Sequence, residues 1–270
     1  MLLRTVPAAV LGTNTTVLAA GTPSGGPGAA TDGPAPCVVV DPGLGVLDRL
    51  RPLLAELRLR PVAVLVTHGH LDHVGEAAEL AREHGCDVVL HAEDAYRLED
   101  PVGGLGPQLR AALLASVGPV DWTPPERVRR LADGDEVVAG DLRVRAVHAP
   151  GHTEGSTLYV VDDVPDAASV AAGGLPAGTG PLPTGLTTTV LAGDVLFAGS
   201  VGRTDLPGGD GAVMARTLRD VVLALPDDAL VVPGHGPATT VAHERRTNPH
   251  LLQALPWPAR TTDDDDTEPR

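Results

Sequence analysis

The feature that most constrains this chain is a recurring pattern in which a short aliphatic run ends in a turn containing Gly, Pro or Asp. Runs of this length between such residues predict β-strands. They occupy Val38–Val40, Val62–Val66, Val88–Leu90, Val137–Val138, Leu142–Val147, Leu158–Val161, Val190–Leu191 and Leu230–Val232. Helical spacing of apolar residues occurs in between, at Val46–Leu59, Val74–His84 and Ala212–Leu225. Strands and helices mixed along the chain predict an α/β or α+β fold class.

The turn after Val62–Val66 carries an unusual cluster, "THGHLDHVG", with His68, His70, Asp72 and His73. A polar loop that gathered histidines by chance is the simplest alternative, but the chain has only 10 histidines in 270 residues. Neutral imidazoles and carboxylates are the usual ligands of zinc and related divalent ions. Positions 68 and 70 can converge on one ion, and Asp72 and His73, on the next turn, can reach a second.

Three further turns offer a polar side chain directly after an aliphatic run. They are "APGHTEGS" with His152, "LAGDVLF" with Asp194 and "VVPGHG" with His235. A single histidine in such a turn is more often solvated or a capping residue. Three such turns in a chain that also has the 68–73 cluster favour a shared metal site.

The motifs "THGHLDH", "PGHT", "GD" and "PGHG", in this order, resemble those of the metallo-β-lactamase superfamily. The resemblance implies a four-layer αβ/βα sandwich with two metal ions at one edge between its halves. It implies two groups of three ligands, one of His68, His70 and His152 and the other of Asp72, His73 and His235. Asp194 would bridge the two ions. Asp41, in "VDPG", would support a ligand histidine from behind; the alternative is a simple turn residue before Pro42.

The cofactors implied by this resemblance are two divalent metal ions, with zinc expected and iron or manganese as alternatives. Hydrolysis is the commonest chemistry of the superfamily. A hydroxide shared by the two ions would be the nucleophile, because zinc lowers the pKa of bound water to about 7. Asp72 would be catalytic as well as a ligand, since its carboxylate can accept or relay a proton.

The substrate expected from the resemblance is a thioester of a low-molecular-weight thiol. The stretches "LFAGSVGRTDLPGGD" and "PGHGPATTVAHERRTNPHL" are similar to those of short bacterial glyoxalase II-like hydrolases, which act on thioesters such as S-lactoylglutathione. About 35 residues follow His235, too few for the helical domain that binds glutathione in larger glyoxalases, so another thiol such as mycothiol is an alternative. Arg203 could bind a substrate carboxylate, or it could brace its own loop by pairing with Asp205.

Other functions stay open at this point. A persulfide dioxygenase would hold one iron ion with His68, His152 and Asp194, although the intact "PGHG" favours the dinuclear hydrolase. A carboxylate at position 194 argues against typical β-lactamases. A lactonase or other ester hydrolase and a non-catalytic metal-binding relative are the remaining alternatives.

Composition restricts the partners. A net charge of −15 argues against nucleic acid, whose phosphates require clustered cations. No apolar stretch reaches the roughly 18 residues of a membrane span. The start, "MLLRTVPAAVLGTNTTVLAA", is interrupted at residues 12–16 and suits a strand and turn better than a signal peptide. We therefore expect a cytoplasmic protein with Cys37 and Cys86 reduced and buried; the oligomeric state is not indicated.

The domain organisation predicted from composition is one metallo-β-lactamase-type domain over residues 1–258. Two segments rich in Gly, Pro, Ala, Ser and Thr, at residues 21–36 and 162–189, are predicted to be flexible insertions. The acidic end, residues 259–270, is predicted to be a disordered tail.

Overall fold

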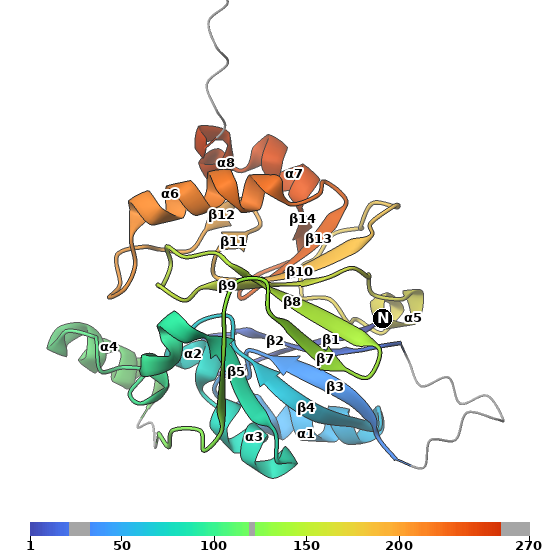
Figure 1. The fold of residues 1–270 in the computed structure, drawn as a ribbon, viewed down its shortest axis with the longest axis horizontal. Coiled ribbons are helices and arrows are strands. Elements are labelled where there is room, and N and C mark those ends of the chain that lie inside the picture. Colours follow the sequence, from blue (N-terminus) through green and yellow to red (C-terminus); the bar gives the residue numbers. More distant parts are fainter. Residues whose placement is uncertain (22–32, 119–121, 255–270) are drawn as a thin grey trace, which may run out of the picture.

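The protein folds as two six-stranded β-sheets that face each other, with helices on both outer faces (Figure 1). The structure is a computed structural model, and it describes residues 1–21, 33–118 and 122–254. In the first sheet, the strands are β1 (Leu2–Pro7), β2 (Asn14–Ala19), β3 (Ala35–Val40), β4 (Leu59–Leu65), β5 (Asp87–His91) and β6 (Val128–Leu131), in this spatial order. β1, β2 and β3 pair antiparallel, whereas β3 to β6 are parallel.

The second sheet has the order β14 (Thr239–Thr240), β13 (Ala229–Pro233), β10 (Thr188–Gly193), β9 (Thr157–Val161), β8 (Leu142–His148) and β7 (Glu136–Ala139). Only β10 and β13 are parallel neighbours in it. A small hairpin, β11 (Leu196–Phe197) and β12 (Ser200–Val201), follows β10. The helices are α1 (Leu47–Glu56), α2 (Leu71–Val74), α3 (Ala77–His84), η1 (Ala92–Leu98), α4 (Pro107–Val117), α5 (Ala167–Ala171), α6 (Gly211–Asp220), η2 (Val222–Ala224), α7 (Val241–Thr247) and α8 (Pro249–Ala254).

Three apolar layers hold these elements together, one between the sheets and one under the helices of each outer face. Successive side chains of a strand point to opposite faces, so Val64 of β4 packs under α1 and α3 while Leu65 packs between the sheets. In β13, Leu230 faces the space between the sheets and Val231 faces α6 to α8. Each fully buried aliphatic side chain contributes roughly 1.5–3 kcal/mol. The αβ/βα sandwich and the mixed α/β class are therefore confirmed.

The predicted strands are confirmed, whereas each predicted helix differs from the observed one at one end or both. Each aliphatic run overlaps a strand, and the interrupted N-terminal stretch forms the β1–β2 hairpin. The helix expected over Val74–His84 begins later, at Ala77, as α3, and Val74 ends the separate helix α2. The C-terminus at Gly85 is as predicted, and its φ of 65° suits glycine. The helix expected over Ala212–Leu225 ends at Asp220 and continues as η2.

The 162–189 segment is not the loop without core residues that its composition predicted. It contains α5 and binds along β1: Thr5 N–H donates to the Gly174 carbonyl at 2.8 Å, and Leu3 N–H donates to the Ser169 side-chain Oγ at 3.2 Å. Leu175 and Leu186 pack against the apolar layer between the sheets. The segment covers the open edge of the first sheet, which explains why a stretch without hydrophobic period is ordered.

The other predicted segments are only partly described. Of residues 21–36, Ala35 and Pro36 belong to β3, and residues 22–32 lie outside the described residues, as does the acidic tail 259–270. The division into one domain and a tail stays a prediction. In the part of the chain that the structure describes, no helix combines the length and apolar character that crossing a bilayer requires.

Candidate metal centre

The motif residues converge because the strands that precede them end at one edge of the sandwich. β8 and β10 are both antiparallel to β9, and β13 is parallel to β10, so all three run in the same direction. His152, Asp194 and His235 follow the ends of these three strands. His68 follows β4 of the facing sheet, and the backbone of Thr157 donates to the Thr67 carbonyl at 2.9 Å, which ties the two sheets together there.

The first group of predicted ligands is a triangle of imidazole nitrogens. His68 Nε2 lies 3.0 Å from His70 Nδ1 and 3.1 Å from His152 Nε2, and His152 Nε2 lies 2.9 Å from His70 Nδ1. All three side chains are largely buried, and burial lowers their pKa values, that of His70 to about 3. The imidazoles are therefore neutral, which is the form that binds metal.

The partners of the remaining ring nitrogens assign the protons. Nδ1 of His152 donates to the Arg203 carbonyl at 2.7 Å, which leaves Nε2 of this ring without a proton. The Thr67 hydroxyl donates to Asp41 at 2.7 Å and so accepts from Nδ1 of His68 at 3.2 Å. The two Nε2 lone pairs, 3.1 Å apart, then face each other with no proton between them. A cation among these nitrogens would replace this repulsion with coordination, so the triangle fits a metal ion.

The second group consists of Asp72, His73 and His235. Asp72 Oδ2 lies 3.1 Å from His235 Nε2 and 3.5 Å from His73 Nε2. Nδ1 of His73 donates to Asp41 Oδ2 at 2.8 Å, so Nε2 is the nitrogen of this ring that would bind an ion, which would displace any proton that it carries. This Nε2 is buried and has no hydrogen-bond partner among the described residues. The ligand atoms of each group lie within 4.8 Å of one another, which suits one ion per group.

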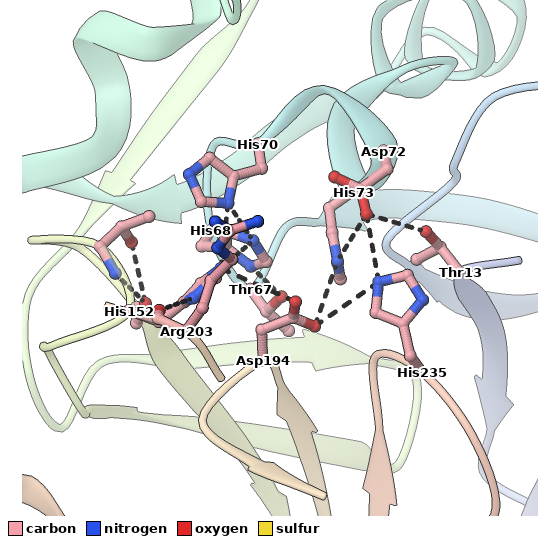
Figure 2. Close-up of polar contacts among 12 residues, drawn as sticks. Thr13, Thr67, His68, His70, Asp72, His73, His152, Asp194, Arg203 and His235 are labelled. Atoms are coloured by element: carbon pink, nitrogen blue, oxygen red, sulfur yellow. Dashed lines mark hydrogen bonds and ion pairs between the residues drawn. The ribbon is translucent and has the colours of Figure 1, made fainter. Parts of the chain in front are cut away.

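Asp194 lies between the two groups (Figure 2). Its Oδ1 is 3.3 Å from His73 Nε2 and 3.8 Å from His235 Nε2, whereas its Oδ2 is 3.7 Å from His152 Nε2. Oδ1 is buried without a hydrogen bond to any described residue. One oxygen of this carboxylate thus faces each group, as a bridging ligand requires.

The charges of the site suit cations. Burial alone would raise the pKa of Asp72 and of Asp194, but the facing His73 imidazole and its neighbours hold both pKa values below the usual range. Burial would lower the pKa of His73, but Asp72 and Asp194 together hold it above its usual value. The two carboxylates are therefore ionised, and the site presents negative charge to an ion.

Asp41 lies directly behind the second group, as the resemblance implied. It accepts from His73 Nδ1 and from both the backbone N–H and the hydroxyl of Thr67, each of the Thr67 bonds at 2.7 Å. Asp41 is 2% exposed and its φ is 50°, in the left-handed region that only a few non-glycine residues adopt. The alternative of a simple turn residue therefore does not describe it.

Asp94 is a supporting residue that the sequence analysis missed. Its carboxylate is fully buried and accepts from Gly69 N–H at 2.7 Å, from the Thr153 hydroxyl at 2.8 Å and from Gly155 N–H at 2.8 Å. It therefore ties the loop of His68 and His70 to the loop of His152. Nothing local in "HAEDAYR" signals this role, because the partners lie far away in the sequence.

The first glycine of "PGHG", Gly234, lies where there is no room for a side chain. A Cβ on Gly234 would collide with Oδ1 of Asp194 and lie 2.7 Å from Cε1 of His73. Any side chain at this position would displace two of the predicted ligands.

Arg203 and His148 hold structural positions. The Arg203 guanidinium pairs with Asp205 at 2.6 and 2.7 Å, so the bracing interpretation describes its contacts, and a substrate role for it stays a prediction. His148 donates to the Glu154 carbonyl at 2.8 Å and its ring stacks on His91 at 3.9 Å. With Glu93, these two histidines form a further group that could hold an ion, away from the predicted ligands.

Comparison with known proteins agrees with this geometry. The family model of the metallo-β-lactamase superfamily matches residues 31–165. The protein Rv2581c of Mycobacterium tuberculosis is 39% identical over 79% of this chain and 86% of its own length. The probable metallo-hydrolase YqgX of Bacillus subtilis is 32% identical over 80% of this chain and 87% of its own. The hydroxyacylglutathione hydrolase GloC of Haemophilus influenzae is 29% identical over 79% and 86%.

Solved structures resemble the fold over nearly its whole length. The B3 metallo-β-lactamase BLEG-1 has a TM-score of 0.67 at 27% identity and covers 93% of this chain and 99% of its own. ETHE1 of Myxococcus xanthus has a TM-score of 0.63 at 25% identity, covering 94% and 85%. TTHA1623 in a di-iron-bound form has a TM-score of 0.61 at 30% identity, covering 90% and 98%. The chain belongs to the metallo-β-lactamase superfamily, and within it the chain is a metallo-hydrolase.

Proposed function

We propose that this metallo-hydrolase cleaves a thioester of a low-molecular-weight thiol and uses two divalent metal ions, most simply zinc, to do so. The observation that carries the proposal is the position of Asp194, with one oxygen toward each group of ligands. A mononuclear enzyme would not need the complete second group of Asp72, His73 and His235. The similarity to GloC, a hydroxyacylglutathione hydrolase, supports a thioester as the substrate.

The ions would lie in the two ligand groups and, when bound, would lower the pKa of a water molecule and polarise the substrate carbonyl. The chain supplies the proton transfer. Asp72 has 21% of its side chain exposed and lines a cavity beside His70. Its carboxylate can accept the proton that water loses as it attacks the carbonyl carbon. Asp72 can then return this proton to the departing sulfur when the C–S bond breaks, which yields a carboxylic acid and a thiol.

Two other reactions remain to be tested. The persulfide dioxygenase considered from the motifs would require one iron ion and molecular oxygen. BLEG-1 is a B3 metallo-β-lactamase by its description, so β-lactam hydrolysis also needs a test. The bridging position of Asp194 and the complete second group favour the dinuclear thioester hydrolase over both.

The decisive experiment combines elemental analysis with a substrate panel. The protein is purified, its metal content is measured, and thioesters, lactones, β-lactams and persulfides are assayed at equal concentrations, with oxygen consumption followed for the persulfides. We expect about two divalent ions per chain and the highest kcat/KM with a thioester.

The outcomes separate the alternatives. One iron per chain with oxygen uptake would establish the dioxygenase. Turnover of lactones or β-lactams above all thioesters would establish a different hydrolase. Two bound ions without turnover of any panel member would support a non-catalytic relative.

A further inference from the structure

Helix α4 carries apolar side chains that are not buried in the core. Among its residues Pro107–Val117, all of which the structure describes, none is buried. Leu109 is 40% exposed, and Leu113 lies one turn further on the same face. These apolar side chains do not contribute to the core; Leu109 and Leu113 instead line a cavity.

This face borders a cavity that reaches the metal site. The cavity has a volume of about 170 Å³. Its polar lining residues are His70, Asp72 and Arg203, and its apolar wall, here called the leucine pocket, includes Leu105, Leu109, Leu113 and Leu206. His70 and Asp72 are predicted ligands of different ions, so a molecule in the cavity can contact both the reacting centre and the leucines.

We propose that the leucine pocket binds the acyl group of the substrate and selects an apolar chain. This inference rests on the proposed thioester hydrolysis and narrows its substrate class. A carbonyl held at His70 and Asp72 places the atoms attached to it in the adjacent cavity, and leucine side chains stabilise methylene groups there by removing them from water.

The same wall disfavours a short hydroxyacyl group. Leucine side chains offer no hydrogen-bond partner, so a hydroxyl buried against them loses its bonds to water without replacement. Arg203, at the rim of the cavity, is already paired with Asp205 through two bonds and does not offer an unoccupied cation. The enzyme therefore prefers an aliphatic acyl thioester to a lactoyl thioester.

The test uses thioesters of N-acetylcysteamine with acetyl, butanoyl, hexanoyl and lactoyl groups, assayed with the metal-loaded protein. Each added methylene is expected to raise kcat/KM by roughly two- to fourfold, fourfold being the effect of fully burying one methylene. Leu109→Gln should reduce this increase. Ala111→Gln, an exposed position on the same helix that does not line the cavity, is the matched control and should retain it.

A binding measurement makes the test independent of turnover. Analogues in which CH2 replaces the thioester sulfur are titrated calorimetrically into the chelator-treated protein. The hexanoyl analogue should bind more tightly than the acetyl analogue, and Leu109→Gln should reduce the difference.

The results distinguish this inference from the proposed function. If kcat/KM does not change with acyl chain length, or is highest for the lactoyl thioester, the leucine pocket does not bind the acyl group. The proposed thioester hydrolysis would be unaffected by that result. A chain-length effect that appears only when the thiol portion is lengthened would also overturn the leucine pocket. If no thioester is hydrolysed, the proposed function fails, and equal binding of both analogues would then reject the pocket as well.

Discussion

Asp41 and His73 are joined by a 2.8 Å hydrogen bond between Oδ2 and Nδ1, and both side chains are almost completely buried. The bond fixes the orientation of the imidazole and directs its Nε2 toward Asp72 and Asp194. A carboxylate in this position also increases the basicity of the ligand nitrogen. The affinity of the second group of ligands for its ion therefore depends on Asp41, a residue that is not itself a predicted ligand.

Asp41→Asn should weaken binding of one of the two ions by roughly 10- to 100-fold, the usual effect of losing such a partner. Both oxygens of Asp41 accept hydrogen bonds, so an amide NH2 in place of either one opposes an N–H or O–H group. Competition with a chromophoric chelator measures the two affinities. Asp48→Asn, at an exposed position of α1, is the control and should leave both unchanged. An unchanged affinity in Asp41→Asn would mean that the bond is only structural.

Asp194→Ala should lose at least one ion and most of the activity while the fold is kept. The lost carboxylate faces both ligand groups, so neither group can compensate for it. Elemental analysis gives the metal content, and circular dichroism reports the fold. His243→Ala, an exposed histidine on α7, is the control for a change near the last motif. Near-normal metal content in Asp194→Ala would contradict a bridging role.

The metal-free protein should be most stable near pH 6.5. The pKa values of His68, His70 and His152 are lowered by burial, that of His70 from 6.5 to about 3. Below pH 6.5 the unfolded chain binds protons that the folded chain does not, so the free energy of unfolding falls on acidification. The raised pKa of His73 acts oppositely, because its contribution is lost as the pH rises above 6.5.

Thermal melts of the chelator-treated protein check this dependence. Between pH 6.5 and 5.0 the free energy of unfolding should fall by at least about 1 kcal/mol, the effect of a single group over one pH unit. The metal-loaded protein, whose ligand imidazoles bind no proton in the folded state, should lose at least as much stability over the same range. A metal-free protein that gains stability on acidification would show that the buried histidines are not neutral.

The candidate ligands can be selected from the sequence because each lies in a short local motif. His68, His70, Asp72 and His73 occupy one short turn, and each distant ligand follows an aliphatic strand directly. Parallel strand ends meet at one edge of a sheet, so a correct assignment of strands and fold brings these turns together.

The features that the sequence did not predict depend on contacts between distant segments. The 162–189 segment lacks a hydrophobic period, yet it binds along β1, which composition does not encode. The apolar face of α4 is short, and only the folded chain places Leu109 in the same cavity as His70. Asp94 has partners 25 and 61 residues away, at Gly69 and Gly155, and no spacing rule connects them.

Asp94→Asn should therefore weaken the first metal site and leave the second one intact. The substitution replaces one carboxylate oxygen by an NH2 group. In one orientation this group faces the donors of Gly69 and Thr153, and in the other it faces the donor of Gly155. A buried donor left without an acceptor costs about 1–3 kcal/mol of the free energy of unfolding, which urea denaturation measures. Because the loops of His68, His70 and His152 meet at Asp94, the affinity for the first ion should fall as well.

The comparison with Asp41→Asn makes the Asp94 prediction specific. Asp94→Asn and Asp41→Asn should each lower the affinity for a different ion, since each carboxylate supports a different ligand group. Glu99→Gln, at an exposed position directly after η1, is the control for a lost charge in this region. If Asp94→Asn lowered stability but left both affinities unchanged, Asp94 would hold the two loops together without positioning the ligands.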